Sequence, residues 1–167
     1  MPKHIIERHI IDGAIDPNEA ERHESPMFRQ AKKRLKEDGH YRCWICGTTA
    51  NIQIHHYGAE WMYASLVNFD ALKDFCETWD VYGYGRLLRQ QPINTVDDIR
   101  NLMALCAGHH EEVDREDGGT GTGIHNLTFS TWLIQNVARP GLNPVPQKGE
   151  TFAVVMTRLH QREGGSI

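Results

Sequence analysis

The stretch Asn101–His110 constrains this 167-residue chain more than any other part of it. It reads Asn-Leu-Met-Ala-Leu-Cys-Ala-Gly-His-His, a short apolar run that ends in one thiol and two imidazoles. Cys106 and His109 are three residues apart, so a tight turn allows both side chains to bind one metal ion, as in the half-sites of structural zinc. Two adjacent imidazoles do not both fit comfortably into that tetrahedron. His110 is therefore left over, and a spare imidazole beside a metal site is a candidate for chemistry.

A matching half-site lies upstream, where Cys43 and Cys46 enclose two residues. Gly47 follows them and can adopt the positive φ that a knuckle turn needs. With Cys106 and His109 the two cysteines form a set of three thiolates and one imidazole, which is a closed structural zinc type. Two ordinary cysteines or a redox pair are the alternatives for the upstream motif alone, and the second half-site favours zinc.

A second pair of histidines lies between the two half-sites. Ile52 and Ile54 alternate with Gln53, and this pattern predicts a short, half-buried strand. The strand ends at His55 and His56. A second strand is expected from Leu102, and it leads through Cys106 into a helix that carries His109, His110 and Asp114.

The order of these motifs resembles the HNH endonucleases, the ββα-metal nucleases, in their zinc-stapled form. The resemblance covers about residues 25–116: C-x2-C, a strand ending in His-His, then N-L-x-x-L-C-x-x-H-H. It implies an α+β chain with a zinc-stapled ββα-metal core and metal-dependent hydrolysis of phosphodiester bonds in double-stranded DNA. The implied cofactors are a structural Zn²⁺ and a catalytic Mg²⁺ or Mn²⁺.

The resemblance also assigns roles to single residues. In members with a His-His pair, the first histidine binds the catalytic metal and the second is the general base, which implies His55 as ligand and His56 as base. A neutral imidazole has suitable basicity near neutral pH, and neighbouring residues on a strand point to opposite sides. His110 matches the family's final histidine and becomes the second metal ligand. Asn101 matches the middle letter and would hold the loop that carries the pair. Asp114 stands where other members have histidine; it is either a third ligand, which suits Mg²⁺ or Mn²⁺, or a solvated helix acid.

Basic residues gather just before the zinc motif, although the formal net charge of the chain is -4. A negative total counts against nonspecific coating of nucleic acid, so the distribution of charge matters more than the sum. Contact with DNA phosphate and a solvated helix face both explain such a cluster. Its members are Arg29, Lys32, Lys33, Arg34, Lys36 and Arg42.

The remaining elements are predicted from local signals. Ser25 and Pro26 are typical of a helix start, and Gly39 of its end. A helical insertion is expected at about 58–98, with Asn68 capping one of its helices. Thr151–Leu159 is rich in β-branched and aromatic residues and predicts a strand.

These predictions divide the chain into an N-terminal arm (1–24), a nuclease domain (25–135) and a C-terminal extension (136–167) that packs on the same domain. No apolar run approaches the ~18 residues that span a bilayer, and the N-terminus lacks a signal-peptide core, so no membrane partner is expected. Cys76 remains unassigned to metal, which suits a reducing compartment better than a disulfide scaffold. We therefore expect a cytoplasmic protein of a bacterial cell, encoded by the cell, a phage or a mobile element. The alternatives to a nuclease are a zinc-organised nucleic-acid-binding module that has lost the reaction and a zinc-stabilised adaptor.

Overall fold

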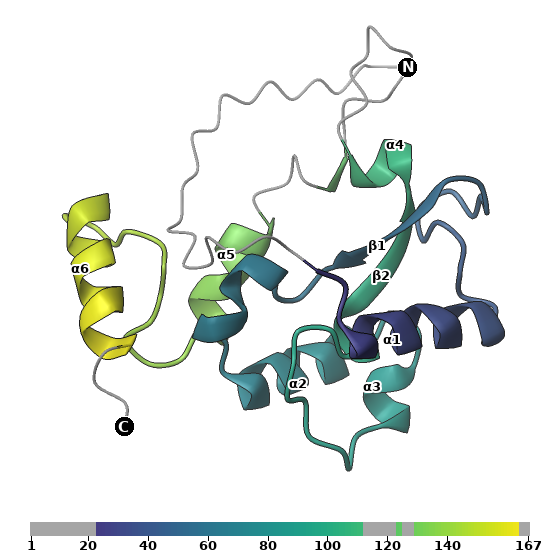
Figure 1. Cartoon of the computed structure of the whole chain (residues 1–167), viewed down its shortest axis with the longest axis horizontal. Coiled ribbons are helices and arrows are strands. Elements are labelled where there is room, and N and C mark those ends of the chain that lie inside the picture. The colour runs from purple at the N-terminus through teal and green to yellow at the C-terminus, as the bar shows by residue number, and fades with distance from the viewer. Residues whose placement is uncertain (1–22, 112–122, 125–128, 164–167) are drawn as a thin grey trace, which may run out of the picture.

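The computed structural model describes residues 23–111, 123–124 and 129–163 of an α+β chain (Figure 1). Most of the expected N-terminal arm lies outside these residues, and so does Asp114. The elements in chain order are α1 (Pro26–Glu37), β1 (Ile52–His56), the 3-10 helix η1 (Trp61–Leu66), α2 (Phe69–Thr78), α3 (Tyr84–Leu87), the 3-10 helix η2 (Ile99–Asn101), β2 (Leu102–Cys106), α4 (Ala107–His110), α5 (Phe129–Val137) and α6 (Phe152–Glu163).

The two strands pair antiparallel; β1 ends in one histidine doublet, and β2 leads into α4, which carries the other (Figure 1). Their register runs from Ile52 opposite Cys106 to His56 opposite Leu102. The chain between them carries η1, α2, α3 and η2, so the expected insertion is helical. Both faces of the hairpin are covered, and the strand predicted as half-buried ends in buried residues. The hairpin is therefore an internal scaffold.

Helix α1 covers one face of this hairpin, and it begins as predicted. The Ser25 hydroxyl accepts a hydrogen bond from the backbone N–H of Phe28 at 3.0 Å, and Pro26 occupies the first turn. Phe28, Ala31 and Leu35 recur at helical spacing and are buried. They pack against residues of the two strands, of which Ile54, Leu102 and Ala104 are buried. The apolar face of α1 thus holds the helix beside the histidine-bearing strand.

The insertion and the C-terminal helices share a second apolar cluster, to which η1, α2, α5 and α6 all contribute. Asn68 caps α2, because its side-chain oxygen accepts hydrogen bonds from two backbone N–H groups of the first turn. Leu72 and Cys76 of α2 are both fully buried in this cluster. Burial raises the pKa of the Cys76 thiol to about 12, so this cysteine stays protonated and behaves as a small apolar residue.

The C-terminal extension differs from the prediction, because Thr151–Leu159 does not form a strand. Residues Phe152–Glu163 form α6, in which Val155 and Leu159 lie one turn apart and are buried against the second cluster. The Thr151 hydroxyl, just before the helix, accepts a hydrogen bond from the N–H of Val154. Helical spacing of the buried pair therefore outweighs the β propensity of the single residues, which depends strongly on context.

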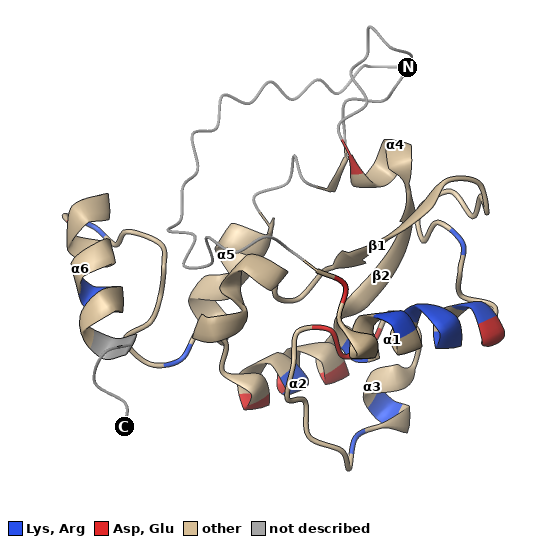
Figure 2. Ribbon diagram, in the orientation of Figure 1, with Lys and Arg blue, Asp and Glu red and all other residues tan. Residues whose placement is uncertain are grey.

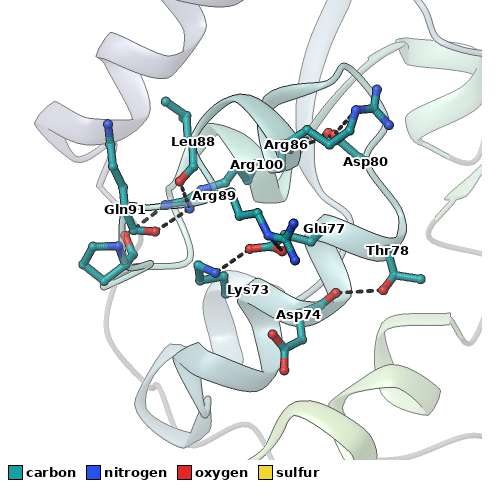
Figure 3. Close-up of polar contacts among 12 residues, drawn as sticks. Lys73, Asp74, Glu77, Thr78, Asp80, Arg86, Leu88, Arg89, Gln91 and Arg100 are labelled. Carbon is teal, nitrogen blue, oxygen red and sulfur yellow. Dashed lines mark hydrogen bonds and ion pairs between the residues drawn. The ribbon is translucent and has the colours of Figure 1, made fainter.

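A buried arginine fixes the loop that leads into β2. Arg100 is 4% exposed, and its guanidinium donates hydrogen bonds to three backbone carbonyls within residues 88–92, including those of Leu88 and Gln91 (Figure 3). It also donates to both carboxylate oxygens of Asp98. A second contact in the same view joins α2 to the loop after α3, because Glu77 accepts from Lys73 and pairs with Arg89 at 3.1 Å. The segment between α3 and β2 is therefore held by the hydrogen bonds of Arg100 and by the ion pair between Arg89 and Glu77.

Within the described ranges, no helix is long and apolar enough to cross a membrane. None of the four cysteines forms a disulfide, and all four lie in described segments. Three of these free cysteines, Cys43, Cys46 and Cys106, lie close together.

Candidate functional site

Three cysteines and one histidine converge where the upstream loop meets the end of β2. The ligand atoms of Cys43, Cys46, Cys106 and His109 all lie within 4.8 Å of one another. The upstream turn is closed by a hydrogen bond from the N–H of Gly47 to the carbonyl of Cys43, and Gly47 has the positive φ, 74°, that was expected. A hydrogen bond from the N–H of Trp44 to the carbonyl of Ala104, at 2.9 Å, joins this turn to β2. The bond lies on the edge of β2 that does not pair with β1.

The separations within this Cys3His group fit a tetrahedral zinc site. With bonds of about 2.3 Å to sulfur and about 2.0 Å to nitrogen, tetrahedral geometry places two sulfurs about 3.8 Å apart and sulfur and nitrogen about 3.5 Å apart. Here the sulfurs of Cys46 and Cys106 are 3.9 Å apart, and His109 Nδ1 lies 3.6 Å from Cys43 Sγ and 3.2 Å from Cys106 Sγ. The group is therefore consistent with the structural zinc that the spacing predicts.

The protonation of Cys43 also suits a metal ligand. Burial raises the pKa of this thiol, but hydrogen bonds from the backbone around Cys46, Cys106 and Ile45 lower it more, and the resulting pKa is about 6. Thiolates are the form that binds metal. The fold thus favours the thiolate of Cys43, mainly through backbone hydrogen bonds.

His55 of the first doublet contacts His110 of the second doublet on one face of the hairpin. The rings of His55 on β1 and His110 on α4 have centroids 5.2 Å apart at an interplanar angle of 68°. Gln53 lies on the same face as His55, two residues earlier, and its side-chain oxygen contacts His110 Nδ1. An amide oxygen only accepts, so Nδ1 carries the proton and Nε2 carries the lone pair, as in metal-binding histidines whose other nitrogen is held by a neighbour. The two imidazoles are therefore in contact with each other, and the Gln53 contact leaves the lone pair of His110 on Nε2.

Sequence reasoning did not identify Gln53 or Glu111 as part of this arrangement. The amide nitrogen of Gln53 donates to the Glu111 carboxylate, which links β1 to the C-cap residue of α4. A period of two along β1 places Gln53 with His55, and that signal was available. Helix α4 carries His109 and His110 and ends at His110, whereas Asp114 lies outside the described residues.

His56 points away from His55 and is buried on the α1 side. Its ring stacks on Phe28, with centroids 5.3 Å apart and an interplanar angle of 20°. Its Nε2 lies 2.7 Å from a carboxylate oxygen of Asp97, and the two side chains are 2% and 10% exposed. The adjacent histidines therefore occupy two different environments, as their alternation on a strand predicts. Asp97 was not predicted, because no local signal distinguishes it from the acid beside it.

Asn101 is fully buried and uses both ends of its amide. Its oxygen accepts from the backbone N–H groups of Gly58 and Ala59 at 2.8 and 3.0 Å, and its nitrogen donates to the carbonyls of Ala59 and Val96 at 2.9 and 2.7 Å. A Cβ on Gly58 would lie 2.6 Å from the Asn101 oxygen, so only glycine fits there. The amide thus fastens the loop after the histidine pair to the loop before β2.

The basic residues before the zinc motif are partly neutralised by neighbouring acids (Figure 2). Lys32 pairs with Glu24, and Lys33 and Arg34 pair with the acids one helical turn later, at 3.6 and 3.3 Å. Lys36 lies over the ring of Tyr41 at 4.6 Å, and Arg42 donates to a backbone carbonyl at 3.2 Å. The side chain of Lys33 remains 77% exposed. The cluster is a mixed-charge face of α1 with exposed lysines on it.

An apolar pocket of about 720 Å³ lies beside the zinc motif. Trp44, Trp79, Met103 and Phe129 contribute to its lining, and the first two are half-exposed. His109 also reaches it, whereas the other histidines of the doublets do not line it. The pocket and the paired histidines are therefore separate features.

Comparison of the chain with protein-family models, with curated proteins and with solved structures finds no match in any of the three. The resemblance to HNH endonucleases thus rests on the sequence motifs. The structure contributes the Cys3His group and an antiparallel two-stranded sheet followed by a helix.

Proposed function

We propose that this protein is a metal-dependent DNA endonuclease of the HNH type, with a structural zinc at the Cys3His group. The observation that carries the proposal is the contact between His55 and His110. These residues come from two doublets far apart in the sequence, and they meet at the end of a hairpin that the Cys3His group fastens. A merely structural zinc motif does not require a second set of imidazoles at this position.

His55 and His110 would hold the catalytic Mg²⁺ or Mn²⁺, with Asp114 as a proposed third ligand. The ion would supply Lewis-acid stabilisation of charge on the phosphate and on the leaving oxygen. Gln53 supports this role of His110, because its contact at Nδ1 leaves the lone pair on Nε2. The zinc ligands take no part in the reaction, since a closed set of four ligands leaves no open position.

His56 would act as the general base. It accepts a proton from a water molecule whose oxygen attacks the phosphorus, and the bond from phosphorus to the leaving oxygen then breaks. Asn101 would act indirectly, by holding the loop that follows His56. Lys32, Lys33, Arg34, Lys36 and Arg42 would contact backbone phosphate of double-stranded DNA, which fixes the position of the duplex without reading its sequence.

One observation favours a second function, that of a nucleic-acid-binding module without the reaction. His56 is 2% exposed and has a carboxylate partner, and a histidine that only stabilises the fold shows the same features. The two functions differ in what the histidines do, so substitutions at the doublets distinguish between them.

The decisive experiment is cleavage of plasmid DNA with Mg²⁺ or Mn²⁺, compared with the same reaction in EDTA. We expect His56→Ala to retain DNA binding and metal binding but to cut about 10²–10⁴-fold more slowly, because it lacks the proton acceptor. His55→Ala and His110→Ala should bind the catalytic metal more weakly, and raised metal concentration should partly restore their activity.

His160→Ala is the matched control, since His160 lies exposed on α6, and it should cut like the wild type. Zinc content is measured for every variant, because loss of the zinc would mimic loss of activity. Wild-type protein that binds DNA with full zinc content and never cuts would establish the binding module instead. Rescue of His56→Ala by excess metal, without rescue of His55→Ala, would reverse the two roles.

A further inference from the structure

The carboxylate of Asp97 is buried against His56, and no role in the proposed reaction has yet been assigned to it. We infer that Asp97 is the positioning residue of the general base, which holds His56 in the tautomer whose Nδ1 accepts the proton. This inference rests on the proposed function, because it names the residue that prepares His56 for that reaction.

The hydrogen bond between the two side chains determines the tautomer. His56 Nε2 and the Asp97 carboxylate oxygen are 2.7 Å apart, and the residues are separated by 41 positions in the chain. An ionised carboxylate only accepts hydrogen bonds, so Nε2 must donate, and a neutral imidazole then carries its lone pair on Nδ1. The contact is shielded from water by the burial of both side chains, which strengthens it.

The surroundings fix the direction of the ring as well as its tautomer. Phe28 stacks on one side of the imidazole and comes from α1, whereas Asp97 comes from the loop before β2. That loop is held by Arg100, which donates to its backbone at three carbonyls. The N–H of Asp97 also donates to the hydroxyl of Thr95 at 3.2 Å. The base is therefore clamped between two elements that the fold brings together.

The next residue, Asp98, provides an internal comparison. Both of its carboxylate oxygens accept from the guanidinium of Arg100, at 2.7 and 2.8 Å, and one caps η2 by accepting from a backbone N–H. Two adjacent acids thus have different tasks: Asp98 stabilises the loop, and Asp97 contacts the base. Asp98→Asn is therefore a matched control for Asp97→Asn.

The first test measures the tautomer directly by ¹⁵N NMR of the histidine side chains, with the wild-type protein retaining its zinc. We expect the signal of His56 to show a protonated Nε2 and an unprotonated Nδ1. Asp97→Asn is isosteric but can donate from its amide, so the Nδ1-protonated form should gain population, as when an Asp that orients a catalytic histidine is replaced. Asp98→Asn and Asp97→Glu should leave the wild-type pattern in place.

Wild-type His56 with its proton on Nδ1 would overturn the inference without any variant. So would an Asp97→Asn protein in which the tautomer of His56 is unchanged. Zinc content and thermal unfolding are recorded for each variant, so that a protein that has failed to fold is not scored as a change of tautomer.

The second test is kinetic. Asp97→Asn should lower kcat by about 10²–10⁴-fold with little change in KM for DNA, and it should cause no further loss in a His56→Ala background. Asp98→Asn should keep the wild-type kcat, although its melting temperature falls. Equal losses from Asp97→Asn with and without His56 would overturn the inference. If wild-type protein does not cut DNA at all, the proposed function fails, whereas the NMR result still decides whether Asp97 sets the tautomer.

Discussion

At the scale of single residues, the strongest constraint on this chain is the convergence of three thiols and an imidazole. Cys43 and Cys46 lie in the loop after α1, whereas Cys106 ends β2 and His109 lies in α4. One ion bound by all four would therefore join three segments of the fold. Such a site contributes directly to folding, because the ligands are not assembled in the unfolded chain.

Cys43→Ser should remove the zinc and destabilise the protein sharply. Metal analysis should find about one zinc per wild-type chain and almost none in the variant. Apparent zinc-binding energies are on the order of 10 kcal/mol, so a loss of even half of that lowers the melting temperature by roughly 10–20 °C. Cys76→Ala is the control: it leaves a small cavity in the core but should keep the zinc. Well-folded wild-type protein without zinc would contradict the prediction.

At the scale of the elements, the contact between α1 and α3 supports the helix that covers His56. The Tyr84 hydroxyl donates to a carboxylate oxygen of Asp38, the residue that ends α1, at 2.7 Å. Arg34 of α1 lies 5.0 Å from the centre of the Tyr84 ring. The hydrogen bond from Tyr84 is the main cause that lowers the pKa of Asp38, and Arg34 adds to it. Protonation of Asp38 therefore weakens the packing of α1.

Tyr84→Phe should lower the melting temperature by about 2–4 °C at neutral pH. The folded pKa of Asp38 is below its unfolded value of about 3.9, so the contribution is complete above that pH and is lost as pH falls through the folded pKa. The difference between wild type and variant should therefore shrink in thermal unfolding series below about pH 4. Tyr82→Phe is the matched control, because the Tyr82 hydroxyl accepts from the N–H of Ala104 and not from an ionisable group. The change in melting temperature that it causes should be the same above and below pH 4.

At the scale of the whole molecule, charge is distributed unevenly over a chain whose formal net charge is -4. Lysine and arginine follow α1 beside the hairpin, and acids gather at the end of that helix and on α2 (Figure 2). Exposed ion pairs along a helix contribute little to stability, so the lysines of α1 remain available for a polyanion.

Charge reversal of the two exposed lysines of α1, Lys33→Glu with Lys36→Glu, should weaken DNA binding for all sequences alike. Each lost phosphate contact should lower the slope of log K against log salt by about 0.9. Lys148→Glu, at an exposed position after α5, is the control and should leave both affinity and slope unchanged. Titrations at several salt concentrations give both quantities, and an unaltered slope in the double variant would reassign α1 to a solvated face.

Several features of this protein follow from local sequence alone. The spacing of the cysteines and His109 indicates one metal group, because a tight turn brings ligands two or three residues apart together. Ser25 and Asn68 mark helix starts, since a cap acts on N–H groups within three residues of it. Alternation along β1 places His55 and His56 on opposite faces, and this too depends only on neighbouring residues. The Cys3His group, α1, α2 and the two strands were therefore predictable.

Other features were decided only by the tertiary structure, because they depend on groups distant in sequence. Asp97 reaches His56 only after the helical insertion has folded, and Gln53 meets His110 only once the strands have paired. Thr151–Leu159 predicted a strand from residue preferences, yet the second apolar cluster accepts Val155 and Leu159 from a helix. The sequence by itself determined which side chains are available for metal and for proton transfer. Tertiary packing decided the hydrogen-bond partners and the exposure of these side chains. Both depend on which segments, far apart in the sequence, bury their apolar surfaces against one another.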